Sequence, residues 1–243
     1  MRRTTLAALV ATAVVLAAPA AAQAINVYAA TSLTGVFPAL NKSPKYNFGG
    51  SNTLQAQIER GAPADVFAAA SPNEAQALFR EGLCTRPVTF AINRLVLLLP
   101  NANPGNVTSV YSLRSGGRRV SIGTAGVPIG AYTRQLLRRM RLTSILSSNT
   151  VSQQTNVGQV SAQVATGSAD AGFVYYTDGL AVKDRTKMLN LPTWAQPPVR
   201  YQICTVKRPG ADTRGAQAFI RQVTGNAGRS ALKHYGFGLP PRG

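Results

Sequence analysis

Residues 25–71 read INVYAATSLTGVFPALNKSPKYNFGGSNTLQAQIERGAPADVFAAAS, and this stretch decides the fold class. Short runs rich in β-branched and aromatic residues predict three strands, at 25–30, 46–48 and 65–70. A hydroxyl-rich turn with an amphipathic stretch separates the first two strands, and a Gly-rich turn with a helix over 54–60 separates the next two. This alternation of strand and helix predicts an α/β fold with a mostly parallel sheet flanked by helices.

A second series of strands and helices follows further along the chain. Apolar runs predict strands at 95–99, 120–123, 171–176 and 199–206. Helical periodicity predicts helices over 132–141, 157–165, 211–223 and 227–235. Because the βα pattern starts again, two lobes are a better interpretation than one long sheet.

The N-terminus has the pattern of an export signal. Two arginines follow Met1, an apolar run extends from Leu6 to Ala18, and small residues fill 20–24. This order predicts a secretory signal peptide over residues 1–24. The apolar run is shorter than the ~20 residues that a membrane-spanning helix needs. We therefore expect an exported, periplasmic protein.

The chain is strongly basic, with 26 Lys and Arg against 8 Asp and Glu and a formal net charge of +18. The basic residues stand singly or in pairs, with no long polybasic run and no interleaved aromatic residues. This scatter favours a solvated basic surface, or long-range attraction of an anionic ligand. A nucleic-acid-binding protein predicts clustered basic and aromatic residues instead.

The two cysteines, Cys84 and Cys204, predict one disulfide because exported proteins meet an oxidising environment. The alternative is a pair of free, buried thiols. We expect no metal bound directly by side chains, since a zinc site needs four ligands and His234 is the sole histidine.

Catalysis is hard to build from this sequence, and we expect no enzyme, no catalytic residue and no cofactor. Paired carboxylates, activated nucleophiles and phosphate-loop lysine motifs are not recognisable. The stronger candidates are Ser32, Ser51 and the turn at 128–130, each of which follows a strand and precedes a helix. Helix starts present unpaired N–H groups that suit an anion. The alternative is that each serine only caps its own helix.

Four runs resemble the periplasmic molybdate-binding proteins of molybdate ABC transporters: AATSLTGVF at 29–37, FGGSNTLQAQIERGAPADVFAAAS at 48–71, GVPIGAY at 126–132 and GFVYYTDG at 172–179. The similarity extends, with gaps, from Ile25 to the YGF at 235–237. It implies a two-lobed type II periplasmic-binding-protein fold with a ligand cleft between the lobes. One lobe would contain residues 25–90 and 200–243, and the other would contain residues 91–199.

The resemblance also implies a set of ligand-binding groups. Ser32 and Ser51 would donate hydroxyl and amide hydrogen bonds, and Ile129 and Val157 would donate their backbone amides. Tyr175 would supply a phenol, although buried strand aromatics usually belong to the core.

The implied ligand is molybdate or tungstate, and the implied partner is a membrane permease that receives the loaded protein. We expect a monomer that binds no nucleic acid. The alternatives are a binder of sulfate or another tetrahedral oxyanion, and a secreted basic surface or nucleic-acid-binding protein. The effector lobe of a transcription regulator shares the fold, but the signal peptide argues against it.

Overall fold

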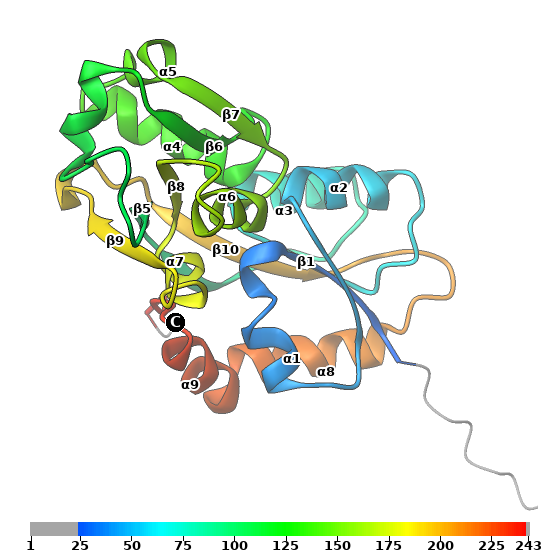
Figure 1. Ribbon diagram of the computed structural model, residues 1–243. Helices are drawn as coiled ribbons and strands as arrows, with labels where there is room; N and C mark the ends of the chain where they lie inside the picture. Colours follow the sequence, from blue (N-terminus) through cyan, green and yellow to red (C-terminus); the bar gives the residue numbers. More distant parts are fainter. Residues whose placement is uncertain (1–23, 242–243) are drawn as a thin grey trace, which may run out of the picture.

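The computed structural model describes residues 24–241, so the predicted signal peptide, apart from Ala24, lies outside the described residues. Two five-stranded sheets, each flanked by helices, form two lobes that lie side by side (Figure 1). Within residues 24–241, no helix combines the length and the apolar character that a membrane crossing requires.

The first sheet has the strand order β2-β1-β3-β10-β4. Its strands are β1 (Asn26–Ala30), β2 (Lys45–Gly49), β3 (Val66–Ala69), β4 (Val88–Asn93) and β10 (Val199–Thr205). Strands β2 and β3 both run parallel to β1. Strand β10 runs antiparallel to both β3 and β4. Because β1, β2 and β3 are parallel, their carboxyl ends reach the same edge of the sheet.

The second sheet repeats this arrangement with the order β7-β6-β8-β5-β9. Its strands are β5 (Leu95–Pro100), β6 (Arg119–Gly123), β7 (Thr150–Gln154), β8 (Ala171–Tyr175) and β9 (Thr186–Asn190). Strands β7 and β8 run parallel to β6, and β5 runs antiparallel to β8 and β9. Each sheet is therefore mixed, with three parallel strands at one side.

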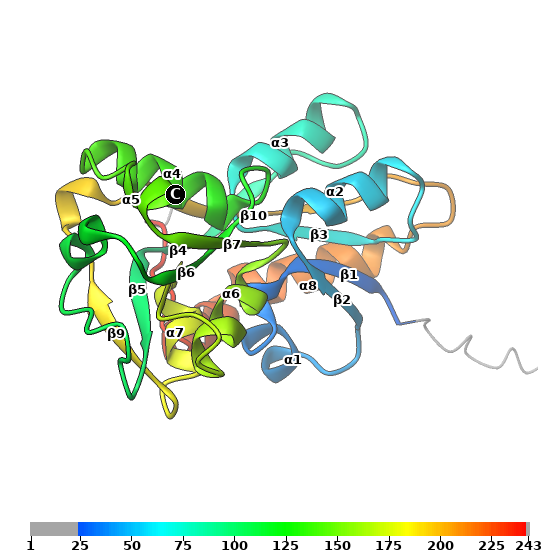
Figure 2. The same ribbon diagram turned by 45° about the horizontal axis from the view of Figure 1, so that its top comes forward.

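Helices cover both faces of each sheet. In the first lobe, α2 (Ser51–Glu59) and α3 (Pro72–Arg80) lie on one face, and α1 (Val36–Leu40), α8 (Thr213–Thr224) and α9 (Asn226–His234) lie on the other (Figures 1 and 2). In the second lobe, α4 (Pro128–Arg139) and α6 (Val157–Ala165) lie on opposite faces (Figure 2). The short elements are α5 (Ile145–Ser148), α7 (Tyr176–Ala181) and the 3-10 turns η1 (Thr31–Leu33), η2 (Val110–Ser115) and η3 (Thr193–Ala195).

The chain crosses between the lobes twice. Strand β4 ends at Asn93 in the first sheet, and β5 begins at Leu95 in the second, so a single residue separates them. The chain returns through η3 into β10, which pairs beside β4. Strands β4 and β10 therefore form the hinge side of the molecule.

Several predicted boundaries differ from the structure. Helix α2 begins at Ser51, three residues before the prediction, and α4 begins at Pro128 where a loop was expected. Proline has no N–H to leave unpaired, so it fits the first position of a helix. Strands β7 and β9 were not predicted.

Candidate functional site

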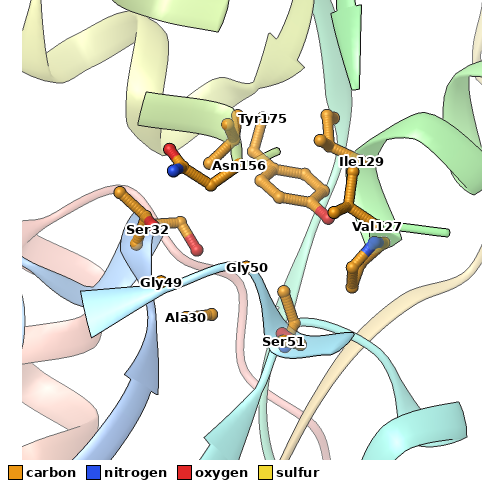
Figure 3. A pocket seen from close by; sticks show the side chains of 13 residues that line it. Ala30, Ser32, Gly49, Gly50, Ser51, Val127, Ile129, Asn156 and Tyr175 are labelled. Carbon is orange, nitrogen blue, oxygen red and sulfur yellow. The ribbon is translucent and has the colours of Figure 1, made fainter. Parts of the chain in front are cut away.

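A small pocket lies between the two lobes, with an empty volume of about 230 Å³ (Figure 3). A pocket this small suits a small ion rather than a drug-sized ligand. The lining residues come from six strand ends, three in each lobe: Ala30, Thr31, Ser32, Gly49, Gly50, Ser51, Ala70, Val127, Pro128, Ile129, Asn156, Val157 and Tyr175. None of them carries a charge. The five residues predicted to bind a ligand are all among them.

Ser51 is the first residue of α2 and is buried. Its Oγ accepts a hydrogen bond from the backbone N–H of Ala70 at 3.0 Å, which occupies one lone pair. An amide N–H cannot accept a hydrogen bond in return, so the Ser51 proton remains to be donated elsewhere. Gly50 is the N-cap of this helix, and no side chain caps it. The alternative that Ser51 only caps its own helix is therefore wrong.

Ser32 lies in η1, directly after β1, and faces the same space as Ser51 in Figure 3. Its Oγ lies 2.8 Å from the phenol oxygen of Tyr201, on the hinge strand β10. The N-cap of η1 is Ala30, so Ser32 does not cap this turn. Its side chain instead connects the pocket to the hinge.

Ile129 and Val157 lie in the first turns of α4 and α6. N–H groups in the first turn of a helix have no carbonyl partner within the helix. Because Pro128 has no N–H, Ile129 supplies the first donor of α4. Asn156 caps α6 by accepting from the N–H of Gln159 at 3.0 Å, which leaves the N–H of Val157 at the pocket. Both helices point their partly positive ends at the pocket.

Tyr175 ends β8 and is 1% exposed. Among residues 24–241, its hydroxyl has no hydrogen-bond partner. Figure 3 shows the ring extending across the pocket with its oxygen toward Val127 and Ser51. Burial raises the pKa of this phenol well above its ordinary value, so it keeps its proton and remains a donor. A buried phenol without a partner is costly, and because this one lines the pocket it is a candidate donor to a ligand.

The lobes touch beside the pocket. A Cβ added to Gly50 would lie 2.3 Å from the backbone oxygen of Thr155, in the other lobe. A Cβ added to Gly158 would lie 2.7 Å from a side-chain carbon of Thr31. The absence of a side chain at these two glycines therefore permits the close approach of the lobes.

Three pocket or near-pocket features were not predicted from the sequence. Thr31 lines the pocket, and its buried hydroxyl has no partner among the described residues. Asn156 caps α6 at the pocket wall. Tyr201 contacts Ser32 from 169 positions further along the chain. The Asn before Val157 was a local signal of a cap, whereas nothing local connects Tyr201 with Ser32.

The two cysteines lie away from the pocket, in a small apolar cluster beneath α3. Both are buried and are free thiols in the structure, so the disulfide is not formed there and stays a prediction. The Cys84 thiol donates to the carbonyl oxygen of Thr85 at 3.2 Å. A hydrogen bond with Cys84, together with burial, raises the pKa of the Cys204 thiol. The two thiols thus lie close together. Nowhere in the described chain do three or more His, Cys, Asp or Glu gather in a way that could hold a metal.

Known proteins resemble this chain over nearly its whole length. Residues 8–238 match the family described as bacterial extracellular solute-binding protein. Molybdate-binding protein ModA of Mycobacterium bovis is 33% identical over 229 residues, covering 90% of this chain and 86% of the relative. The solved structure of the Azotobacter vinelandii periplasmic molybdate-binding protein has a TM-score of 0.78 at 26% identity, with 89% of this chain and 100% of that chain covered.

A more distant structure shows the fold alone. The sulfate-binding protein SubI of Mycobacterium tuberculosis has a TM-score of 0.73 at 15% identity, with 88% of this chain and 86% of that chain covered. Two lobes, a hinge of two adjacent strands and a small pocket of hydrogen-bond donors agree with the family match. This chain belongs to the bacterial extracellular solute-binding proteins.

Proposed function

We propose that this chain is the periplasmic solute-binding component of an ABC importer and that it captures molybdate, with tungstate held by the same groups. The observation that carries the proposal is the buried Tyr175 hydroxyl, which faces the pocket and has no partner among the described residues. The names of the Mycobacterium bovis and Azotobacter vinelandii relatives support the choice of ion.

The proposed ligand groups are the hydroxyls of Ser32, Ser51 and Tyr175 and the amides of Ile129 and Val157. All of them can donate a hydrogen bond, and a fully deprotonated oxyanion offers only acceptors. Donors must replace the water that closure removes, because burying an unpaired charge costs several kcal/mol. The N–H groups at helix starts and the hydroxyls can replace this water without any cation in the site.

Sulfate is the alternative ligand because it has the same charge and shape as molybdate. It is smaller, so donors spaced for molybdate would contact fewer of its oxygens at once. The distance between donors across the pocket therefore decides which of the two ions binds more tightly. A competition experiment between sulfate and molybdate measures this preference.

We further propose that the predicted signal peptide directs the chain to the periplasm, where it acts as a monomer and delivers its ion to a membrane permease. The net charge of +18 would attract anions over a long range and raise the capture rate. Salt screens such attraction, so the association rate should fall as ionic strength rises.

The proposed lobes are residues 25–90 with 200–243, and residues 91–199. The division of strands supports this, since β1 to β4 and β10 build one sheet while β5 to β9 build the other. Strand β4 continues to Asn93, which puts the first crossing a few residues after the proposed boundary.

Calorimetric titration of the mature chain with molybdate, tungstate, sulfate and phosphate tests the function. We expect tight binding of molybdate and tungstate, and a clear loss for Ser51→Ala, which removes one donor and leaves the Ala70 N–H without its partner. Ser121→Ala is the matched control, because Ser121 is buried in β6 and does not line the pocket. If the wild type binds none of these ions, or prefers sulfate to molybdate, the proposed ligand is wrong.

A further inference from the structure

A chain of hydrogen bonds leads from the pocket to the hinge. The Ser32 Oγ lies 2.8 Å from the Tyr201 phenol oxygen. Behind it, the side-chain amide nitrogen of Asn93 lies 3.5 Å from the same phenol oxygen and 2.9 Å from the Thr177 hydroxyl. Asn93 and Tyr201 lie on β4 and β10, the two hinge strands, and Thr177 belongs to the second lobe.

The orientation of the Asn93 amide gives this chain a direction. The backbone N–H of Arg94 donates to the Asn93 Oδ1 at 2.9 Å, so the oxygen of the amide is held by a donor and its NH₂ group faces Tyr201 and Thr177. The NH₂ group can only donate. The Tyr201 phenol therefore accepts from Asn93, which leaves its own proton available for donation to Ser32.

Tyr201 can fulfil this role because it stays protonated. The side chain is 0% exposed, and burial raises the pKa of its phenol well above the ordinary value. Its ring is held by edge-on contacts with Phe90, Tyr175 and Phe237, at centroid distances of 6.1, 5.9 and 5.4 Å. The phenol oxygen is thus fixed in position, 2.8 Å from the Ser32 Oγ, with a proton that it can donate there.

We propose that Tyr201 and Asn93 determine which anions the pocket accepts, by fixing Ser32 as a proton donor; the inference rests on the proposed function and adds the origin of its specificity. With its Oγ occupied from behind, Ser32 has one proton to give, and it points at the ligand. Ser51 is set in the same way by the Ala70 N–H.

The consequence concerns anions that carry a proton. Monohydrogen phosphate is a dianion like molybdate, but its P–OH group needs an acceptor. If Ser32 accepted that proton, its own proton would lose its acceptor on the ligand or turn to Tyr201, and in the second case the Tyr201 proton would face the NH₂ group of Asn93. Two donors would point at each other, which makes this arrangement unfavourable. The chain of donors therefore rejects a protonated anion at Ser32, whereas charge alone cannot distinguish the two dianions.

Two variants test this with the mature wild-type chain as reference, by calorimetric titration with molybdate and with phosphate under mildly alkaline conditions. Tyr201→Phe keeps the ring and removes the donor behind Ser32. Asn93→Asp replaces the NH₂ group by an acceptor. The Tyr201 proton is then drawn toward residue 93, away from Ser32, which reverses the direction of these hydrogen bonds. We expect both variants to bind molybdate about tenfold more weakly. We also expect the preference for molybdate over phosphate to fall by a similar factor in both.

Controls separate this role from a loss of structure. Tyr46→Phe removes a phenol proton that is donated to the carbonyl oxygens of Phe37 and Asn41, none of which lines the pocket, and should lower the melting temperature without changing the ion preference. In a Ser32→Ala background, Tyr201→Phe should have no further effect on the preference. The extra negative charge of Asn93→Asp repels both dianions, so it cancels in their ratio.

The outcomes are distinguishable. If the wild type binds no molybdate, the proposed function and this inference fail together. If the wild type binds molybdate but folded Tyr201→Phe and Asn93→Asp keep the wild-type preference, only the inference fails. Should one variant not fold, the other still decides, since Tyr201→Phe removes the donor to Ser32 and Asn93→Asp redirects that donor's proton.

Discussion

Replacing Tyr175 by Phe should stabilise the empty protein and weaken its binding of the ligand. The ring would keep its edge-on contacts with Tyr132 and Tyr201, at centroid distances of 6.5 and 5.9 Å. The oxygen that is removed has no hydrogen-bond partner in the described part of the chain. The Tyr175 hydroxyl thus destabilises the ligand-free protein and stabilises the complex with the ligand.

The size of both effects follows from the burial of Tyr175. A buried hydroxyl without a partner costs about 1–3 kcal/mol. Opening of the lobes admits water to the pocket and reduces this cost, so we expect a gain of about 1 kcal/mol, or about 2–4 °C in melting temperature for a chain of this size. A hydrogen bond to a charged ligand contributes about 1.5–3 kcal/mol, so affinity should fall by about 10- to 100-fold.

Scanning calorimetry without ligand and isothermal titration with molybdate measure the two effects on the same samples. Tyr46→Phe is the matched control: its phenol has two carbonyl partners, at 3.1 and 2.6 Å, so losing it should lower the melting temperature and leave affinity unchanged. A Tyr175→Phe protein that melts lower than the wild type and binds molybdate equally well would refute the reasoning.

Three further predictions concern lobe closure, pH and the thiols. Gly50→Ala should weaken molybdate binding by about tenfold or more in a titration, because the added Cβ would lie 2.3 Å from a backbone oxygen of the other lobe. Gly126→Ala, whose Cβ would meet its nearest atom at 3.7 Å, should bind normally, and equal affinities would contradict the closure argument. Burial raises the pKa of Asp178 to about 7, so the folded state holds a proton that the unfolded state loses near the ordinary value of 3.8. The free energy of unfolding should therefore fall as pH rises between these two values and level off above the higher one, and Asp178→Asn should abolish this slope in denaturant titrations. Protein exported to an oxidising compartment should show no free thiols when denatured, and reduction of a Cys84–Cys204 bond should lower its melting temperature; two reactive thiols per denatured chain would show that the bond does not form.

The strands that the sequence predicted are those with strong apolar patterns. Residues 95–99 form the buried strand β5, since a continuous apolar run suits a strand covered on both faces. The missed strands β7 and β9 read TVSQQ and TKMLN and lie at the two edges of the second sheet. Pairing with neighbouring strands holds β7 and β9 in place. Because they lack an apolar pattern, this pairing cannot be recognised from their sequences.

The candidate site was predictable where each residue has a local signal. Ser32 and Ser51 follow strands and open helical turns, and the structure brings them to one pocket. The boundary of α4 was misplaced because Pro128 and Gly130 resemble loop residues when seen alone. The contact between Tyr201 and Ser32 could not be predicted, because it depends on how β10 pairs within the first sheet.

The path of the chain between the two sheets has a consequence for the order in which the two lobes can fold as the chain emerges. Strands β5 to β9 are continuous in sequence, so the second lobe has all of its strands once residue 190 has emerged. The first lobe does not, because β10 is inserted between β3 and β4 and ends at Thr205. Domains tend to fold as units as the chain emerges. The first lobe therefore starts earlier in the sequence than the second lobe but is completed later. Until β10 emerges, the edge of β3 that pairs with it stays unpaired.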